Sequence, residues 1–240
     1  MFPRTQAGEA PEAVVVNTAG GIAGGDRLQC AVTALQSASI AVTSQTPERV
    51  YRALEESSEV RTRLEARDAA RLAWLPQETI VFDRARLRRR TEVEVAADAE
   101  VLALEWFVLG RAARGEEVLD GLISDSWEVK VDGRLLWADT FRATRETFPQ
   151  LRRRALLGEY RAAATLIHSG PRLDGRLDRI RDLIASLHCA GGATSVGGLI
   201  VVRLAAAAAS ELRRALRGCL DGLCRELGGA PFRVPKMWSS

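Results

Sequence analysis

A glycine-rich stretch, Asn17–Asp26, is the first place where this sequence could do chemistry. It follows a short apolar run, and backbone amides in such a loop cradle a phosphate when a Lys and a Ser or Thr follow the second glycine. Gly20 and Gly25 have that spacing, but Asp26 and Arg27 come next. A carboxylate there would repel phosphate. The stretch therefore predicts a tight crossing between two strands rather than a nucleotide site.

Other catalytic and metal-binding patterns are weak. The sequence has no nucleophile elbow, and of its 2 histidines only His188 stands beside a soft ligand, Cys189. Adjacent carboxylates such as Glu55 and Glu56 would face opposite ways on a strand, so they form no acid–base pair. We therefore predict that the protein is not an enzyme and holds no metal ligand set.

Cysteine usage and overall charge indicate the cellular compartment and the classes of partner. The 4 cysteines lack disulfide spacing, and no signal peptide or long apolar stretch is present, which predicts a cytoplasmic protein with no membrane partner. The 34 basic and 31 acidic residues are intermixed. The one dense basic run, residues 84–90, is followed by Glu92 and Glu94, which indicates a solvated strand face and no nucleic-acid partner.

Strands dominate the first part of the chain and repeat as strand, short turn, strand. The units span residues 28–45, 60–77 and 92–107, with turns near residues 36–39, 66–70 and 96–100. The turns recur about every 30 residues, which is typical of similar layers stacked on one another. In the second unit the apolar positions alternate with charged ones, as in a half-buried sheet. We predict a mainly β fold of stacked antiparallel β-hairpin layers.

One further hairpin is indicated by Asp132-Gly133, which separates residues 122–131 from residues 134–138. Asp-Gly is favoured in a two-residue type I′ turn because both of its central residues have positive φ. The flanking segments are rich in apolar and β-branched residues. A β-hairpin is therefore predicted here.

The pattern changes in the last third of the chain, where two strands alternate with two helices. Residues 162–167 and 199–204 read as strands, and leucines and isoleucines at helical spacing mark residues 173–187 and 212–227, with stops at Gly191-Gly192 and Gly228-Gly229. We predict a small C-terminal βαβα portion, residues 149–240, packed on a layered β body, residues 1–148.

Three stretches resemble the signature segments of one protein family. They are NTAGGIAGGDRL (Asn17–Leu28), LAWLPQETIVFDRA (Leu72–Ala85) and LGRAARGE (Leu109–Glu116). VYRA (Val50–Ala53) and the terminal VPKMWSS (Val234–Ser240) resemble lesser landmarks of the same family. On these residues, in the right order over essentially the whole chain, the sequence resembles the urease accessory protein D family (UreD, called UreH in some organisms).

The resemblance implies a cytoplasmic maturation factor without catalytic activity. Members of this family act as a scaffold that binds the urease apoprotein. They recruit a second accessory protein, the F protein, and through it a GTPase, the G protein, so that Ni²⁺ reaches the urease active site. The resemblance also implies an internal water-filled passage, with no cofactor stably bound and Ni²⁺ present only in transit. Oxygen ligands hold Ni²⁺ more weakly than His and Cys, so the ion could move on.

Candidate residues follow from the matching motifs. The loop-shaping candidates are Gly20, Gly21, Gly24, Gly25, Pro76, Gly110 and Gly115. The candidates for partner contact or passage lining are Asp26, Tyr51, Arg52, Trp74, Gln77, Glu78, Glu105, Arg111 and Glu116. We expect the four carboxylates among them to approach one another and to line a polar interior or a partner surface. Turn-fixing and salt-bridging roles are the alternative.

The start of the chain departs from the family pattern. Family members usually carry further strands before the point at which this sequence has Met1–Arg4, so we expect a truncated start or a misassigned initiator. The result would be an unpaired sheet edge. Pro47 and Glu48 also replace small or apolar residues before the Tyr-Arg landmark. We expect this edge and the apolar segment Trp106–Leu109 to make the protein insoluble without a partner.

Two other function classes stay open on the sequence alone. A β-rich carbohydrate-active or hydrolytic enzyme would need two carboxylates about 5 to 10 Å apart in an open groove. A structural interaction module unrelated to urease would not bind the F protein.

Overall fold

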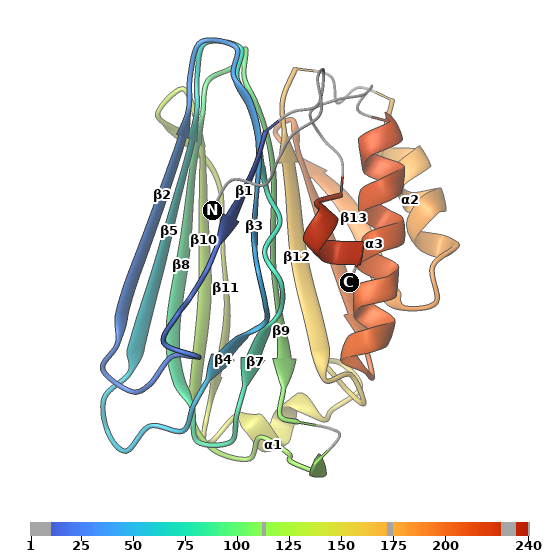
Figure 1. Ribbon diagram of the computed structural model, residues 1–240. Coiled ribbons are helices and arrows are strands. Elements are labelled where there is room, and N and C mark those ends of the chain that lie inside the picture. The colour runs from blue at the N-terminus through green and yellow to red at the C-terminus, as the bar shows by residue number, and fades with distance from the viewer. Residues whose placement is uncertain (1–10, 112–113, 172–174, 227–233, 240) are drawn as a thin grey trace.

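The computed structural model describes residues 11–111, 114–171, 175–226 and 234–239, which form two facing β-sheets with helices on the outside of one of them (Figure 1). The helix-covered sheet has the order β1 (Glu12–Val15), β3 (Ser39–Ser44), β6 (Arg71–Trp74), β9 (Glu100–Leu109), β12 (Ala162–Ser169), β14 (Leu199–Ala206) and β13 (Ala190–Val196). Two short strands extend it beside β9, namely β7 (Thr79–Val81) and then β4 (Glu48–Val50).

The second sheet, which we call the outer sheet, has no helix on its far face in Figure 1. Its order is β11 (Arg134–Thr144), β10 (Leu122–Val131), β8 (Arg86–Val95), β5 (Ser58–Ala66) and β2 (Arg27–Ala34). The helical elements are α1 (Phe148–Leu151), α2 (Leu177–Ala185), α3 (Ala209–Glu226) and a 3₁₀ turn, η2 (Lys236–Ser239). The predicted mainly β class is confirmed. Within the described residues, no helix combines the length and the apolar composition needed to cross a bilayer.

The repeating units stack as predicted, but their strands pair in parallel. Strands β2, β5, β8 and β10 are parallel neighbours in the outer sheet, and β3, β6 and β9 are parallel neighbours in the helix-covered sheet. Each strand–turn–strand unit therefore crosses from one sheet to the other instead of folding back within a single sheet. The predicted antiparallel hairpin pairing within the layers is wrong.

The turns explain this crossing. Ser37 and Asp68 have φ values of 58° and 55°, a left-handed conformation that turns the chain out of the plane of its strand. The Ser37 amide donates to the Asp68 carbonyl of the next unit at 2.7 Å. The Ala69 amide donates to the Asp98 carboxylate of the unit after that, at 3.1 Å. The turns thus bond to the next layer, which continues the stack.

The Asp132-Gly133 turn does form the predicted hairpin. Strands β10 and β11 are antiparallel, and Asp132 and Gly133 have φ values of 48° and 76°. Positive φ at both positions is what a type I′ turn requires. Strand β11 continues to Thr144, well beyond the predicted end.

The C-terminal portion contains the two predicted strands and two predicted helices, and one strand more. Strand β13 contains Gly191 and Gly192, which were expected to stop a helix. A Cβ atom on Gly191 would lie 2.4 Å from Leu204 Cδ2, so a glycine lets β13 pass close to its neighbour. Residues 172–174 and 227–233, which include Leu173 and the expected Gly228-Gly229 stop, lie outside the described residues. Because β12 pairs with β9, one sheet spans the predicted boundary at residue 148, and the division into two portions stays a prediction.

Apolar side chains pack on both faces of the helix-covered sheet. One cluster lies between this sheet and helices α2 and α3, and two lie between the sheets. Strand β9 is buried on both faces, which accounts for its continuous apolar sequence. Trp106, Phe107 and Val108 are only 0%, 5% and 7% exposed. These three side chains therefore form no exposed apolar patch, and the insolubility expected without a partner stays a prediction.

Glu100 links three neighbouring strands through its carboxylate. It accepts from Arg71 Nε on β6 at 2.7 Å and lies 2.8 Å from His168 Nε2 on β12. Burial opposes ionisation of Glu100, but the hydrogen bonds and charges of His168 and Arg71 outweigh it and lower the pKa of the carboxyl. A lowered folded-state pKa means that the ionised group stabilises the fold above its unfolded pKa, and that this contribution is lost as pH falls through the folded value.

Glu100→Gln is therefore expected to lower the free energy of unfolding by about 1–3 kcal/mol at neutral pH. The difference in stability between the wild type and the variant should become smaller below about pH 4. Urea unfolding of the wild type and the variant at pH 7 and in mild acid measures this difference. Glu59→Gln is the control, because the side chains of the Glu59–Arg61 ion pair are 36% and 63% exposed and the pair should contribute less than about 1 kcal/mol. A gap of constant size at every pH would contradict the assignment.

Candidate functional site

Three charged side chains meet between the two sheets. Arg89 on β8 donates from Nε and Nη2 to the two carboxylate oxygens of Asp125 on β10, at 2.9 and 2.6 Å. Its Nη1 donates to Glu105 Oε2 on β9 at 2.7 Å. Arg89, Glu105 and Asp125 are 4%, 5% and 6% exposed. We call these three residues the buried triad.

Neutral side chains complete the surroundings of the triad. Trp74 Nε1 donates to Glu105 Oε1 at 2.9 Å, and Arg89 Nη1 also donates to Thr79 Oγ1 at 3.0 Å. Burial raises the pKa of Glu105; the charge of Arg89 reduces this effect and the charge of Asp125 adds to it. Burial opposes the charge on Arg89, but the two carboxylates raise its pKa overall. The guanidinium therefore stays charged.

Two clefts meet at the triad. The first, the Trp74 cleft, has a volume of about 330 Å³ and is lined by Trp74, Pro76, Gln77, Thr79, Arg89 and Glu105, among others. The second, the Trp127 cleft, has a volume of about 400 Å³ and is lined by Glu105, Phe107, Asp125, Trp127, Phe141 and Tyr160, among others. Glu105 lines both clefts, so the triad stands between them.

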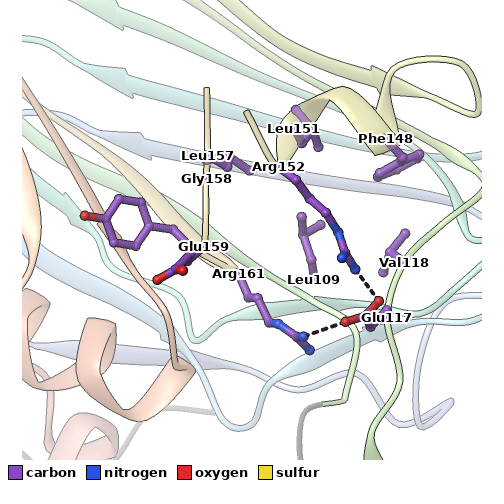
Figure 2. A pocket seen from close by; sticks show the side chains of 11 residues that line it. Leu109, Glu117, Val118, Phe148, Leu151, Arg152, Leu157, Gly158, Glu159 and Arg161 are labelled. Carbon is purple, nitrogen blue, oxygen red and sulfur yellow. Dashed lines mark hydrogen bonds and ion pairs between the residues drawn. The ribbon is translucent and has the colours of Figure 1, made fainter. Parts of the chain in front are cut away.

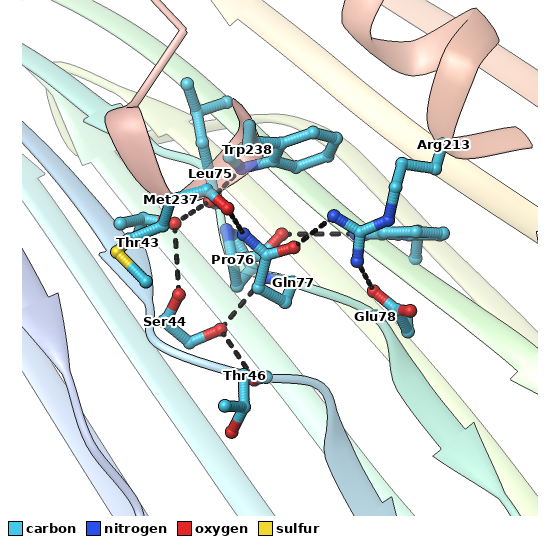
Figure 3. Close-up of polar contacts among 11 residues, drawn as sticks. Thr43, Ser44, Thr46, Leu75, Pro76, Gln77, Glu78, Arg213, Met237 and Trp238 are labelled. Atoms are coloured by element: carbon cyan, nitrogen blue, oxygen red, sulfur yellow. Dashed lines mark hydrogen bonds and ion pairs between the residues drawn. The ribbon is translucent and has the colours of Figure 1, made fainter. Parts of the chain in front are cut away.

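The second family landmark holds the end of the chain. Arg213 on α3 donates to Gln77 Oε1 at 2.7 Å and also to Glu78, while Gln77 Nε2 donates to the Met237 carbonyl at 3.3 Å (Figure 3). The Pro76 carbonyl accepts from Trp106 Nε1 at 3.1 Å. These residues therefore join the helix-covered sheet to α3 and to η2.

The first and third landmarks are linked at the surface through Tyr51 and Phe82. The Tyr51 hydroxyl donates to the Gly20 carbonyl at 3.0 Å, and the Tyr51 ring meets the Phe82 ring edge to face at 5.2 Å between centroids. The guanidinium carbon of Arg111 lies 4.2 Å from the centroid of the Phe82 ring. Arg111 Nε also donates to Glu116 Oε2 at 2.7 Å. We call Tyr51, Phe82, Arg111 and Glu116 the surface cluster.

Two loop glycines allow the close approaches in this region. A Cβ on Gly21 would lie 2.8 Å from the Arg49 carbonyl, and Gly21 has a φ of 150°. A Cβ on Gly110, which has a φ of 74°, would lie 2.5 Å from the Glu116 carbonyl oxygen. Positive φ is also found at Gly20, Gly25 and Gly115, whereas Gly24 has none and instead lies close to Ala53 and Glu56.

The remaining predicted residues have local roles. Asp26 accepts from the Ala23 amide at 2.8 Å within its own loop, and Arg52 forms an isolated bridge with Ala85. Asp26, Glu78, Glu105 and Glu116 thus have different partners, and among the described clefts none is lined by two of them. The predicted convergence of the four carboxylates is wrong. In the described part of the chain, no three His, Cys, Asp or Glu side chains gather as a metal site.

A third cleft, of about 300 Å³, lies beside α1 and contains none of the predicted residues. Glu117 lines it and accepts from Arg152 and, at 2.9 Å, from Arg161, while Phe148 and Leu151 line its apolar side (Figure 2). Of the two acidic residues in the lining, Glu117 and Glu159, Glu117 is already paired with two guanidinium groups.

Sequence reasoning missed Arg89, Asp125, Arg213 and the burial of Trp238. Arg89 was counted with the solvated basic run, and that prediction is wrong for this residue, although Arg88 and Arg90 are exposed. A signal was available. Leu87 and Thr91 point inward, so the period of two along a strand places Arg89 inward as well.

Comparison with known proteins gives a consistent result. The UreD urease accessory protein family matches residues 1–239. Proteins called urease accessory protein UreD are similar over most of their length: that of Methylobacterium sp. (strain 4-46) is 42% identical over 100% of this chain and 84% of its own. The Rhizobium etli protein is 44% identical over 95% and 81%, and that of Xanthobacter autotrophicus is 40% identical over 97% and 78%. The chain therefore belongs to the UreD family of urease accessory proteins.

Proposed function

We propose that this protein is a non-enzymatic scaffold of urease maturation, which binds the urease apoprotein and recruits the F protein and, through it, the G-protein GTPase. The observation that carries the proposal is the family match over essentially the whole chain. The GTP chemistry belongs to the partner in this proposal. The loop after β1 has Asp26 and Arg27 where a phosphate-binding loop needs Lys and Ser or Thr.

Burial divides the candidate residues between two roles. Tyr51, Arg52, Arg111, Glu116 and Asp26 are at least partly exposed, and we assign them to partner contact. Trp74, Gln77, Glu78 and Glu105 are buried and hold or line the interior. Tyr and Arg are the side chains most often enriched at the energetic centre of protein interfaces, which supports the surface cluster as a docking point.

The interior clefts support a role in passing Ni²⁺. The Trp74 and Trp127 clefts meet at carboxylates; their linings include no histidine and one cysteine, Cys30, in the Trp74 cleft. Oxygen donors hold Ni²⁺ loosely enough for release, so Ni²⁺ would be a cargo and not a resident cofactor. We place the protein in the cytoplasm, which fits its 4 cysteines, all of them free.

The hydrolase alternative has less support. Glu105 and Asp125 share Arg89 as their partner, and both are buried rather than standing in an open groove. Glu92 and Glu128 line a cleft on the outer sheet, but both are paired with Arg90. Membership of a urease accessory family likewise argues against a module unrelated to urease.

Co-expression with the urease subunits and the F and G proteins tests the proposal. Affinity purification of the tagged chain should recover a complex, and Tyr51→Ala should reduce the recovered partner several-fold because it removes the ring that packs on Phe82. Tyr160→Ala is the matched control, since Tyr51 and Tyr160 are 37% and 39% exposed and Tyr160 lies outside the surface cluster. If the wild-type chain recovers none of these proteins, the proposed function is wrong.

A further inference from the structure

Four oxygen atoms converge on the guanidinium of Arg89. They are the two carboxylate oxygens of Asp125, Glu105 Oε2 and Thr79 Oγ1, at 2.9, 2.6, 2.7 and 3.0 Å from its nitrogens. The donors come from both sheets, because Asp125 lies in the outer sheet and Glu105 and Thr79 lie in the helix-covered sheet. Carboxylate and hydroxyl oxygens aimed at one point form the kind of donor set that suits a hard or borderline divalent cation.

The triad holds one basic and two acidic side chains. The guanidinium of Arg89 faces the buried carboxyl groups of both Glu105 and Asp125. A buried charge without full compensation is costly. A divalent cation in the same place would match the two carboxylates, which a guanidinium does not.

A fourth side chain points to the same place. The Thr91 hydroxyl is fully buried on β8, two residues along from Arg89, and makes no hydrogen bond within normal distance in the described structure. The hydroxyl lies close to Glu105, but not in normal hydrogen-bond geometry. A bound ion or its water would supply the missing hydrogen bond.

We infer that Arg89 is a displaceable plug on a latent divalent-cation site, whose ligands are Glu105, Asp125 and the Thr79 hydroxyl. This inference rests on the proposed passage of Ni²⁺, because the triad stands between the Trp74 and Trp127 clefts. When the guanidinium turns into the Trp74 cleft, which Arg89 already lines, the four oxygens are released to a cation. When it returns, it displaces the ion. The plug thus separates the two clefts and makes binding reversible.

Removing the plug is the direct test. In Arg89→Met of the full chain the carboxylates lose their cation, and added Ni²⁺ should raise the melting temperature saturably. The rise should reach about 5–10 °C at roughly a hundredfold excess over the dissociation constant. Wild type should respond less, because Ni²⁺ must compete with the guanidinium. Arg88→Met, on the exposed face of the same strand, corrects for Ni²⁺ bound elsewhere.

Neutralising the carboxylates in the same background supplies the second arm. Arg89→Met combined with Glu105→Gln and Asp125→Asn should lose the Ni²⁺ response. If Arg89→Met does not fold, Arg89→Lys replaces it, because one ammonium cannot satisfy both carboxylates and should leave a smaller Ni²⁺ response. Equal responses in the Arg89 and Arg88 variants, or a response that survives neutralisation, would overturn the inference. An intact wild-type complex in the pull-down would then leave the scaffold proposal standing.

Discussion

Arg89→Met is expected to lower the free energy of unfolding by about 3–5 kcal/mol in the absence of added metal. The guanidinium is the only partner cation of Glu105 and Asp125 among the described ion pairs, and both carboxylates are buried. Removing it leaves two like charges between the sheets without water to solvate them. Arg88→Met should change the free energy by less than about 0.5 kcal/mol, because Arg88 is exposed on the same strand.

The loss should depend on pH. Burial raises the pKa of Glu105, and loss of Arg89 removes the charge that opposes this rise. Glu105 then favours the folded state most when protonated, and this contribution is lost as pH rises through the folded pKa. The defect of Arg89→Met should therefore be largest at neutral pH and smaller near pH 4. Guanidinium chloride unfolding at several pH values measures both effects, and equal stabilities for the Arg89 and Arg88 variants would contradict the argument.

Much of the fold could be predicted from alternation and spacing. Val60–Arg67 alternates between apolar and charged side chains, and the structure buries Thr62, Leu64 and Ala66 while exposing Arg61 and Arg63. The partner of each strand could not be predicted, because side chains alternate with the same period in parallel and antiparallel sheets. The difference lies in the turns. Ser37 and Asp68 adopt positive φ although neither is glycine, and a hydrogen bond between them joins their two layers.

The candidate site was predictable only in part. Trp74 belongs to the second landmark and Glu105 lies just before the third, and the structure joins them with a hydrogen bond between β6 and β9. The carboxylates of Asp26 and Glu116, in contrast, are held by groups a few residues away along the chain. Such local bonds compete with long-range convergence. Asp125 lies 36 positions from Arg89, so their pairing depends on strand order that no short motif records.

The C-terminal landmark is expected to contribute as much stability as the triad. Trp238 is 2% exposed, stacks on Trp106 with ring centroids 5.8 Å apart, and donates Nε1 to the Leu75 carbonyl at 3.0 Å. Trp238→Ala is expected to cost about 3–5 kcal/mol, because it removes a buried aromatic side chain and opens a cavity in the core beneath α3. Arg213, which lies over both indole rings, would lose part of its support.

Trp238→Phe separates packing from hydrogen bonding. It keeps an aromatic ring beside Trp106 but removes the donor to Leu75, so we expect a loss of about 1–3 kcal/mol. Urea unfolding of both variants measures the difference, and equal losses would mean that the ring is not what holds the segment.

Loss of the Trp238 contacts should also affect the interior of the protein. Leu75 directly precedes Pro76 and Gln77, which line the Trp74 cleft, and Gln77 also binds the Met237 carbonyl. A loosened C-terminal segment should therefore disturb the part of that cleft lined by Pro76 and Gln77, so Trp238 and Met237 support a wall of the proposed nickel path from outside it.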